Sequence, residues 1–197
     1  LMSRRRVVVT GMGMGTPLGN NVKDTWDNIL EGKSGVSEIT SFDASQFSTR
    51  FAAQVNNFDA TQYMSVKEAR KMDLFIQYGI ASAVQALEDA DLNADSADLS
   101  RVGCAIGSGI GGLPMIEKNL ELLNESGPKR ISPFFVPGAI INMISGHVAI
   151  RFGFKGPNIS IVTACTTGTH NIGMAGRMIA YGDADVMIAG GAEMAIT

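Results

Sequence analysis

The chain has 197 residues, 45% of them hydrophobic, which is enough for one domain with a substantial core. Its formal net charge of −3 and its sequence pI of about 5.4 leave no overall positive field to attract phosphates, so we expect no nucleic-acid partner. No stretch approaches the roughly 18 apolar residues typical of a membrane-spanning helix, so we expect no membrane partner.

The N-terminal part is predicted to form a strand and then a helix. The strand, "RVVVTGMGMG" at 6–15, runs into glycines, and together with Pro17 these interrupt the apolar run too early for a signal peptide. The helix, "NVKDTWDNILEG" at 21–32, has Asn21 as its N-cap and Gly32 past its end. The apolar side chains that we expect on its buried face are Val22, Trp26, Ile29 and Leu30.

A loop-rich stretch, residues 33–65, separates this helix from the next, and we expect only a short strand in it, near 51–55. The next helical pattern, "SVKEARKMDLFIQYGIASAVQALEDA" at 65–90, opens with a capping box formed by Ser65 and Glu68. Its second half is rich in alanine and glycine, which are often fully buried. The pattern therefore predicts one continuous helix, buried along its later part.

A second strand that runs into glycines is predicted at 101–112, "RVGCAIGSGIGG", followed by a helix at 113–127 with Pro114 in its first turn. The "GSGIGG" segment matches the dinucleotide-binding pattern G-x-G-x-x-G. The acidic residue expected about 20 residues further on is missing, so we interpret these glycines as close packing where the chain leaves the sheet. The apolar stripe expected on the helix consists of Ile116, Leu120 and Leu123.

The last part reads as strand, helix and strand: "NISIVTAC" at 158–165, residues 166–182, and "DVMIAGGAE" at 185–193. Strands that alternate with helices predict an α/β fold with a largely parallel sheet. No linker divides the chain, so we predict one domain over 1–197, and an incomplete one because the last strand ends close to Thr197. The small helix residues that would allow close approach are Gly168, Gly173, Ala175 and Gly176.

Cys165 lies where a predicted strand turns into a helix, and its position alone allows two interpretations. It is a buried structural thiol, because free cysteine is among the most buried residue types, or it is a nucleophile. A sharp strand-to-helix turn lifts its residue out of the sheet, and the free N–H groups of a helix start favour a thiolate and a developing oxyanion. Cys104, inside "VGCAIG", is expected to be a core thiol. Two cysteines so far apart form no CxxC motif and fit a reducing cytosol.

A nucleophilic cysteine usually needs a base, and the chain offers two histidines, His147 and His170. His170 follows Cys165 by five residues on the same predicted helix, which would strain a direct pairing. His147 lies on an apolar helix. We therefore expect both histidines to support the core or the site. Two histidines and two dispersed cysteines also lack metal-ligand spacing, so we expect no metal.

The segment "SIVTACTTGTHNIG" resembles the active-site cysteine segment of β-ketoacyl-[acyl-carrier-protein] synthases. The similarity extends nearly end to end, through "RRRVVVTGMGMGTPLGN", "ARKMDLFIQYGIASAVQAL", "AIGSGIGG", "KRISPFFVPGAIINM" and "AYGDADVMIAGGAEMAIT". The "RKMD" and "SPFFVP" regions resemble the type II, elongating enzymes of bacterial fatty-acid synthesis more than the type I enzymes.

The resemblance implies the N-terminal half of a thiolase-like fold, αβαβα layered, with a mixed, mostly parallel sheet and helices on both faces. It also implies a cytoplasmic homodimer that catalyses a two-stage reaction. Cys165 takes an acyl group from acyl carrier protein, and malonyl carrier protein then decarboxylates and attacks that thioester. No cofactor is implied, because phosphopantetheine arrives on the carrier protein. The family's two histidine donors and its lysine lie in the C-terminal half, so we expect residues 1–197 alone to be inactive in condensation.

The resemblance also assigns roles to single residues. Cys165 is the nucleophile, and its own N–H is one oxyanion donor. Ile110 lines the base of the acyl pocket, and Phe135 reaches that pocket across the dimer. The basic residues expected to receive the acidic carrier protein are Lys67, Arg70 and Lys71, with Lys129 and Arg130 adding to them. The i, i+3, i+4 spacing of the first three places them on one helix face.

Other functions remain as alternatives. A chain-length-factor-like partner of polyketide systems is non-catalytic and replaces the cysteine, which is present here. A polyketide ketosynthase would keep it. Thiolases share the fold but use coenzyme A thioesters, and the basic residues and the "TACTTGTH" context argue against them.

Overall fold

The computed structural model describes residues 5–93 and 95–197. The α-helices are α1 (Val22–Leu30), α2 (Val66–Ala69), α3 (Leu74–Asp89), α4 (Leu113–Ser126), α5 (Phe135–Ala139), α6 (Met143–Phe152) and α7 (Thr167–Tyr181). The strands are β1 (Ser37–Glu38), β2 (Phe51–Ala52), β3 (Val102–Gly107), β4 (Asn158–Ile159) and β5 (Val186–Gly191). Short 3₁₀ turns cover Ala60–Gln62, Leu99–Arg101, Pro128–Arg130 and Ala164–Thr166. Among the helices described, none combines the length and apolar character needed to span a bilayer.

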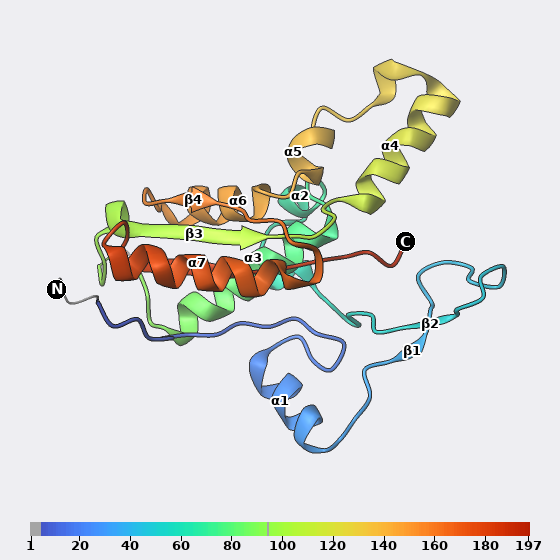
Figure 1. Cartoon of the computed structure of the whole chain (residues 1–197). Coiled ribbons are helices and arrows are strands. Elements are labelled where there is room, and N and C mark those ends of the chain that lie inside the picture. The colour runs from blue at the N-terminus through green and yellow to red at the C-terminus, as the bar shows by residue number, and fades with distance from the viewer. Residues whose placement is uncertain (1–4, 94) are drawn as a thin grey trace.

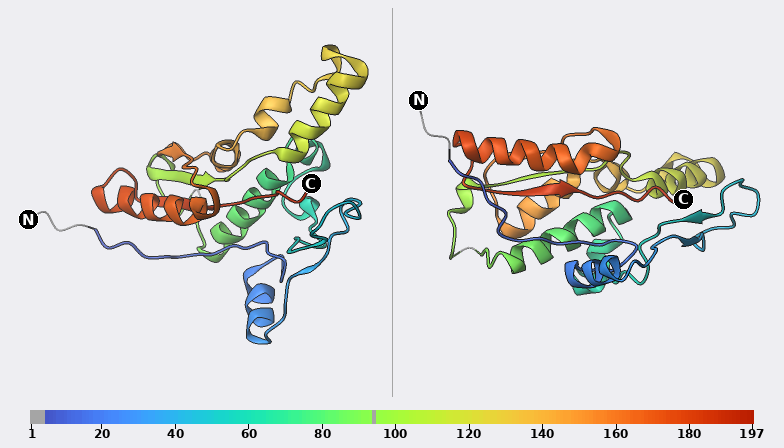
Figure 2. Two further views of the ribbon diagram at one scale, coloured as in Figure 1. Left: turned by 45° about the vertical axis from the view of Figure 1, so that its right-hand side comes forward. Right: turned by 60° about the horizontal axis from the view of Figure 1, so that its bottom comes forward.

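A parallel sheet in the order β4-β3-β5 forms the centre of the chain (Figure 1). β3 pairs with β5 along its whole length, from Val102 opposite Val186 to Gly107 opposite Gly191. Helix α7 packs on one side of this sheet, and α6, with α3 against it, packs on the other (Figure 2). Because both faces are covered, every residue of β3 is buried. The α/β fold with a largely parallel sheet is therefore confirmed.

The core lies between the sheet, α3 and α6. Its largest fully buried side chains include Phe75 and Ile76 of α3 and Ile144 and Val148 of α6. Cys104 of β3 is also in this cluster, with no exposed surface. The burial expected for the alanine- and glycine-rich half of the helix at 65–90 is confirmed, and so is the core position of Cys104.

The prediction of one continuous helix at 65–90 is wrong, because the helix is interrupted between the end of α2 at Ala69 and the start of α3 at Leu74. The capping box of Ser65 and Glu68 starts α2 as predicted. At Asp73 the backbone is extended, and its N–H donates to Gly138 O at 3.0 Å. The buried Asp73 carboxylate accepts the N–H of Met115 in the first turn of α4, while burial raises the pKa of this carboxyl. Asp73 therefore joins the starts of α3 and α4 to α5.

The strand expected at 6–15 is also wrong: the described part of this segment contributes no sheet residues. Its N–H groups are used elsewhere, since Met12 N–H donates to Asp89 Oδ2 at 2.9 Å and Met14 N–H to Gln85 Oε1 at 3.2 Å, both on α3. A cavity of about 300 Å³ separates the segment from α7 and β5. The segment is thus held on α3, and it does not join the edge of β5.

The outer elements lie away from the sheet. β2 falls within the stretch where a short strand is expected, and it pairs with β1. Helix α1 begins after Asn21 as predicted, and Gly32 follows its end with a φ of +68°. The apolar faces of α1 and α4 are nevertheless exposed, contrary to expectation, because both helices stand at the periphery and α4 projects outward (Figure 1). The exposed side chains are Trp26, Ile29, Leu30, Ile116, Leu120 and Leu123.

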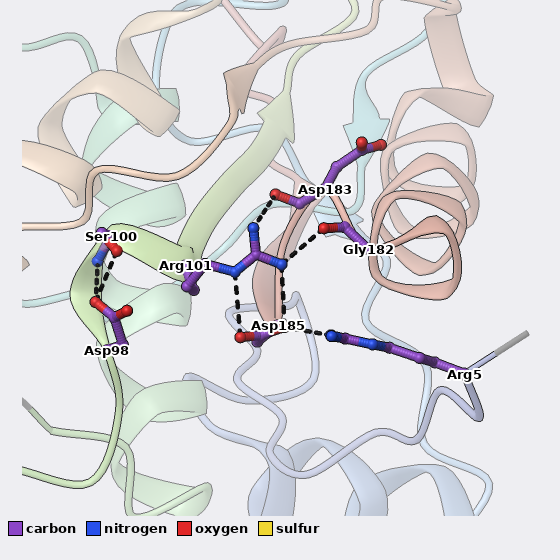
Figure 3. A network of polar contacts seen from close by, with 7 residues as sticks. All are labelled: Arg5, Asp98, Ser100, Arg101, Gly182, Asp183 and Asp185. Atoms are coloured by element: carbon purple, nitrogen blue, oxygen red, sulfur yellow. Dashed lines mark hydrogen bonds and ion pairs between the residues drawn. The ribbon is translucent and has the colours of Figure 1, made fainter.

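Arg101 links the beginnings of β3 and β5 to the end of α7 (Figure 3). Its guanidinium donates to both carboxylate oxygens of Asp185 at 3.2 Å, to Gly182 O at 2.7 Å and to Asp183 O at 3.3 Å. Arg5 also pairs with Asp185. The hydrogen bond from Arg101, followed by that from Arg5, lowers the pKa of Asp185 to about 2.

This shift predicts a pH dependence of stability. The folded pKa of Asp185 lies below its usual 3.8, so its stabilising effect is full above about pH 4 and is lost as the pH falls towards about 2. We expect Asp185→Asn to lose less unfolding free energy than the unchanged protein between about pH 5 and about pH 2.5, as measured by urea unfolding. Glu125→Gln, at an exposed position, is the control that keeps the original slope. Parallel curves for Asp185→Asn and the unchanged protein would contradict the assignment.

Candidate active site

Cys165 lies in the 3₁₀ turn Ala164–Thr166, directly before α7, and is exposed. The residue before it, Ala164, has a φ of +52°, a left-handed conformation that costs a non-glycine residue on the order of 1–2 kcal/mol. The exposed turn position expected for a nucleophile is confirmed, and the buried-thiol interpretation is wrong. The strand before it is shorter than expected, because β4 ends at Ile159.

Two side chains of α7 hold the segment that leads into this turn. The Asn171 side chain is fully buried, accepts Ile161 N–H at 3.1 Å, and donates to Ile161 O and Thr167 O at 2.9 Å each. Thr167 Oγ1 accepts the N–H of Thr163 at 3.0 Å. These bonds replace a sheet ladder, which explains the early end of the predicted strand. Sequence reasoning missed the anchoring role of both residues, because no local pattern indicates which backbone groups a helix side chain binds.

The sheet and the start of α7 approach each other closely beside Cys165. A Cβ added to Gly191 at the end of β5 would lie 3.0 Å from Gly168 Cα and N, so glycine at 191 allows a tight approach of the two backbones. Ala175, about two turns further along α7, is buried. Close approach is thus confirmed for Gly168. The expectation is wrong for Gly173, where an added Cβ would meet none of the described atoms within 4 Å.

A cavity of about 480 Å³ opens beside Cys165. Its walls come from the loop after β3, the start of α7 and the segment after β5. Ile110, expected to line an acyl pocket, is one of the lining residues and is 53% exposed. Phe135 is outside this cavity, half-buried at the start of α5. The chain therefore brings Ile110 and Cys165 together and leaves Phe135 apart from them.

The loop Ser108–Gly111 holds a carboxylate from the end of the chain. The N–H groups of Gly109 and Ile110 donate to Glu193 Oε2 at 2.7 and 2.9 Å, and Ser108 Oγ donates to Glu193 Oε1 at 2.6 Å. The amides that a dinucleotide phosphate would need are thus engaged by Glu193, which agrees with interpreting the "GSGIGG" glycines as close packing. Sequence reasoning missed Glu193.

The two histidines occupy different environments. His170 is exposed, and its Nδ1 lies 2.6 Å from Thr163 Oγ1, two residues before Cys165. It supports the turn, as expected, but is not a core residue. His147 on α6 is half-buried, and burial lowers its pKa against the opposing effect of Glu68. Burial raises the pKa of the Cys104 thiol to about 12, which removes Cys104 as a nucleophile. Within residues 5–93 and 95–197, no group of three His, Cys, Asp or Glu side chains is placed to hold a metal ion.

The basic residues fall into two separate groups. Lys67 and Arg70 are exposed on and just after α2, and Lys71 Nζ lies 4.7 Å from the centre of the Phe134 ring. Lys129 and Arg130 lie in the turn Pro128–Arg130, at the outer end of α4 (Figure 1). The 14 residues of α4 give a separation of roughly 20 Å along that helix. Lys67, Arg70 and Lys71 thus lie near the start of α4, which Asp73 contacts, and Lys129 and Arg130 lie beyond its end.

The fold and the cysteine turn agree with the family comparison. The chain belongs to the β-ketoacyl synthase family: the model of the β-ketoacyl synthase N-terminal domain matches residues 4–197. Curated relatives named 3-oxoacyl-[acyl-carrier-protein] synthase 2 are 61% identical in Vibrio harveyi and 60% identical in Coxiella burnetii. Each alignment covers 100% of this chain and 47% of the relative. The chain thus spans about half the length of the curated relatives it matches.

Solved structures give the same fold. A type II polyketide ketosynthase, solved in complex with its acyl-carrier protein and bound to a hexaketide, has a TM-score of 0.83 at 29% identity. The superposition covers 97% of this chain and 51% of the ketosynthase chain. A β-ketoacyl synthase from Burkholderia phymatum also has a TM-score of 0.83, at 28% identity, with coverages of 98% and 48%. The predicted thiolase-like fold of an N-terminal half is confirmed.

Proposed function

We propose that the protein containing this chain is a β-ketoacyl-[acyl-carrier-protein] synthase of fatty-acid elongation, in which Cys165 carries the growing acyl chain. The observation that carries this proposal is the exposed thiol at the start of α7, beside a cavity of about 480 Å³. The family match and the relatives named 3-oxoacyl-[acyl-carrier-protein] synthase 2 support it.

The proposed first stage is an acyl transfer. The Cys165 thiolate attacks the thioester carbonyl of an acyl carrier protein, a new C–S bond forms at Cys165, and the phosphopantetheine thiolate leaves with its electron pair. Backbone N–H groups at the start of α7, including that of Cys165, stabilise the oxyanion. In the second stage, malonyl carrier protein loses carbon dioxide, and its carbanion forms a C–C bond to the acyl carbonyl carbon. The C–S bond to Cys165 breaks, and the Cys165 thiolate leaves with the electron pair. Residues outside this chain serve the decarboxylation, and no cofactor beyond the arriving phosphopantetheine takes part.

Mass spectrometry of the protein after incubation with an acyl thioester of acyl carrier protein tests this function. The expected result is the mass of one acyl group on the peptide that contains Cys165. Acylation at another residue, or none, contradicts the proposal.

Carrier-protein docking is proposed at Lys67, Arg70 and Lys71. The acyl-carrier protein bound to the polyketide ketosynthase, a structural neighbour, supports such a partner. We expect Arg70→Glu with Lys71→Glu to weaken carrier-protein binding about tenfold at low salt and less at high salt, because exposed charges are screened. Titration calorimetry at two salt concentrations measures this. Lys155→Glu, exposed after α6, is the control that leaves affinity unchanged. Equal affinity of the double variant and the unchanged protein at low salt would contradict the assignment.

A cytoplasmic homodimer is also proposed, as the family resemblance implies. The arm formed by α4 and α5 supports it, because the arm projects from the sheet and exposes apolar side chains (Figure 1). Phe135 lies in this arm, outside the cavity of its own chain, which agrees with a role in a partner's pocket. Lys129 and Arg130, at the outer end of the arm, would then add to the docking patch of the partner.

Among the alternatives, the chain-length-factor-like role is disfavoured by the exposed Cys165. The ishigamide ketosynthase/chain length factor nevertheless has a similar fold, with a TM-score of 0.82 at 27% identity. A polyketide ketosynthase is disfavoured because the 61% identity to the synthase of Vibrio harveyi far exceeds the 29% to the polyketide enzyme.

A further inference from the structure

Glu193 fastens the loop Ser108–Gly111 at several points. Its Oε2 accepts two consecutive backbone N–H groups, and its Oε1 accepts the hydroxyl of Ser108. Ser108 is 1% exposed, and its Oγ in turn accepts the N–H of Gly111 at 3.1 Å. Hydrogen bonds to a carboxylate are stronger than those between neutral groups. One side chain therefore fixes the backbone of the loop from its first residue to its last.

The loop is also in contact with the turn that carries the thiol. A Cβ added to Gly109 would lie 2.8 Å from Glu193 Oε2 and 3.2 Å from Ala164 Cα and O. Gly109 is thus packed between the carboxylate and the left-handed residue that precedes Cys165. A displacement of the loop would change the space beside the nucleophile.

Ile110 is the large side chain of this loop, and it lines the cavity shared with Cys165. Its position depends on its backbone, whose N–H donates to Glu193 at 2.9 Å. The Ile110 side chain itself is 53% exposed, so its own packing holds it little. The carboxylate is therefore the main restraint on where this side chain stands in the cavity.

We infer that Glu193 is a positioning residue that holds Ile110 in place and so limits the length of the acyl chain that Cys165 accepts. This role rests on the proposed acyl transfer to Cys165. Glu193 acts through the loop backbone and takes no part in the bond-making steps. When the carboxylate is removed, Ile110 can move aside, and long acyl chains gain more than short ones.

The test compares Glu193→Ala and Glu193→Gln with the unchanged, complete protein. Glu193→Gln is the conservative variant, because glutamine keeps one oxygen that can accept both loop N–H groups. Glu125→Ala on α4 is the matched control, since it removes an exposed carboxylate. Rates of Cys165 acylation are measured by mass spectrometry with hexanoyl and hexadecanoyl acyl carrier protein. Alkylation of Cys165 by iodoacetamide and the melting temperature are measured alongside.

We expect Glu193→Ala to raise the ratio of hexadecanoyl to hexanoyl acylation by about tenfold, since a misplacement of about 1 Å in a site changes rates by up to about 100-fold. Glu193→Gln and Glu125→Ala should stay within about twofold of the original ratio. An unchanged ratio in Glu193→Ala, or an equal loss with both thioesters accompanied by a lower melting temperature, overturns the inference. Failure of the unchanged protein to accept either acyl group contradicts the proposed function instead.

Discussion

Replacing Cys165 by alanine should abolish acyl loading, with a fall of at least about 10⁴-fold in rate, because no thioester can form without the sulfur. Stability should change by less than about 0.5 kcal/mol, since the side chain is exposed and packs little. Mass spectrometry of the acylated protein and urea unfolding measure the two effects. This combination, a large loss of reaction with an unchanged fold, is what distinguishes a nucleophile from a structural thiol.

Cys104→Ala is the matched control. Cys104 is fully buried in β3, and its removal leaves a small cavity that should lower the free energy of unfolding by about 1 kcal/mol. Its pKa of about 12 keeps the thiol protonated, so loading should be unchanged. Acyl transfer that survives in Cys165→Ala and disappears in Cys104→Ala would reverse the assignment of the two cysteines.

The elements that sequence predicts correctly are those set by local signals. Helix α1 starts after Asn21 because the side chain caps it, accepting Asp24 N–H at 2.8 Å. β3 and β5 are continuous apolar runs, and such runs suit strands covered on both faces. The segments at 6–15 and 158–165 also contain short apolar, β-branched runs, but a strand also needs a partner. Side chains of α3 and α7 take their backbone groups, and no local pattern reveals that choice.

The candidate site divides in the same way. The turn at Cys165 is predictable, because its signal is local: an apolar run is followed directly by small residues. The contact of Glu193 with Gly109 joins residues 84 positions apart. It arises because the parallel pairing of β3 and β5 brings their carboxyl ends to the same edge of the sheet. The exposure of the apolar faces of α1 and α4 could not be predicted either. Amphipathic spacing predicts an apolar face, but it does not say whether the same chain covers that face.

The second large effect is expected at Asn171, which anchors the segment before the nucleophile. In Asn171→Asp, an oxygen replaces the amide nitrogen that donates to Ile161 O and Thr167 O, so two buried hydrogen bonds become contacts between acceptors. We expect the free energy of unfolding to fall by about 3 kcal/mol, and acyl loading of the folded protein to fall by about 10- to 100-fold as the turn shifts. Burial should raise the pKa of the new carboxyl, so the loss of stability is full at neutral pH and is partly relieved as the pH falls and the group becomes a donor.

Asn119→Asp separates loss of stability from loss of position. Asn119 is also buried, 4% exposed, and its side chain donates to Met115 O at 2.8 Å and accepts Ser132 N–H at 3.0 Å, within the arm that projects from the sheet. The same exchange of nitrogen for oxygen there should destabilise the protein. Loading is therefore measured with a small acetyl thioester of pantetheine, which needs neither the docking residues nor the acyl pocket, and it should be unchanged in Asn119→Asp. The two variants are compared under conditions in which the same fraction of each is folded. If their loading rates then fall by the same factor, Asn171 acts through stability alone. If only Asn171→Asp loses loading, the buried amide sets the position of the thiol. Its side chain bonds the N–H and the C=O of Ile161, which a neighbouring strand would bond in a longer sheet.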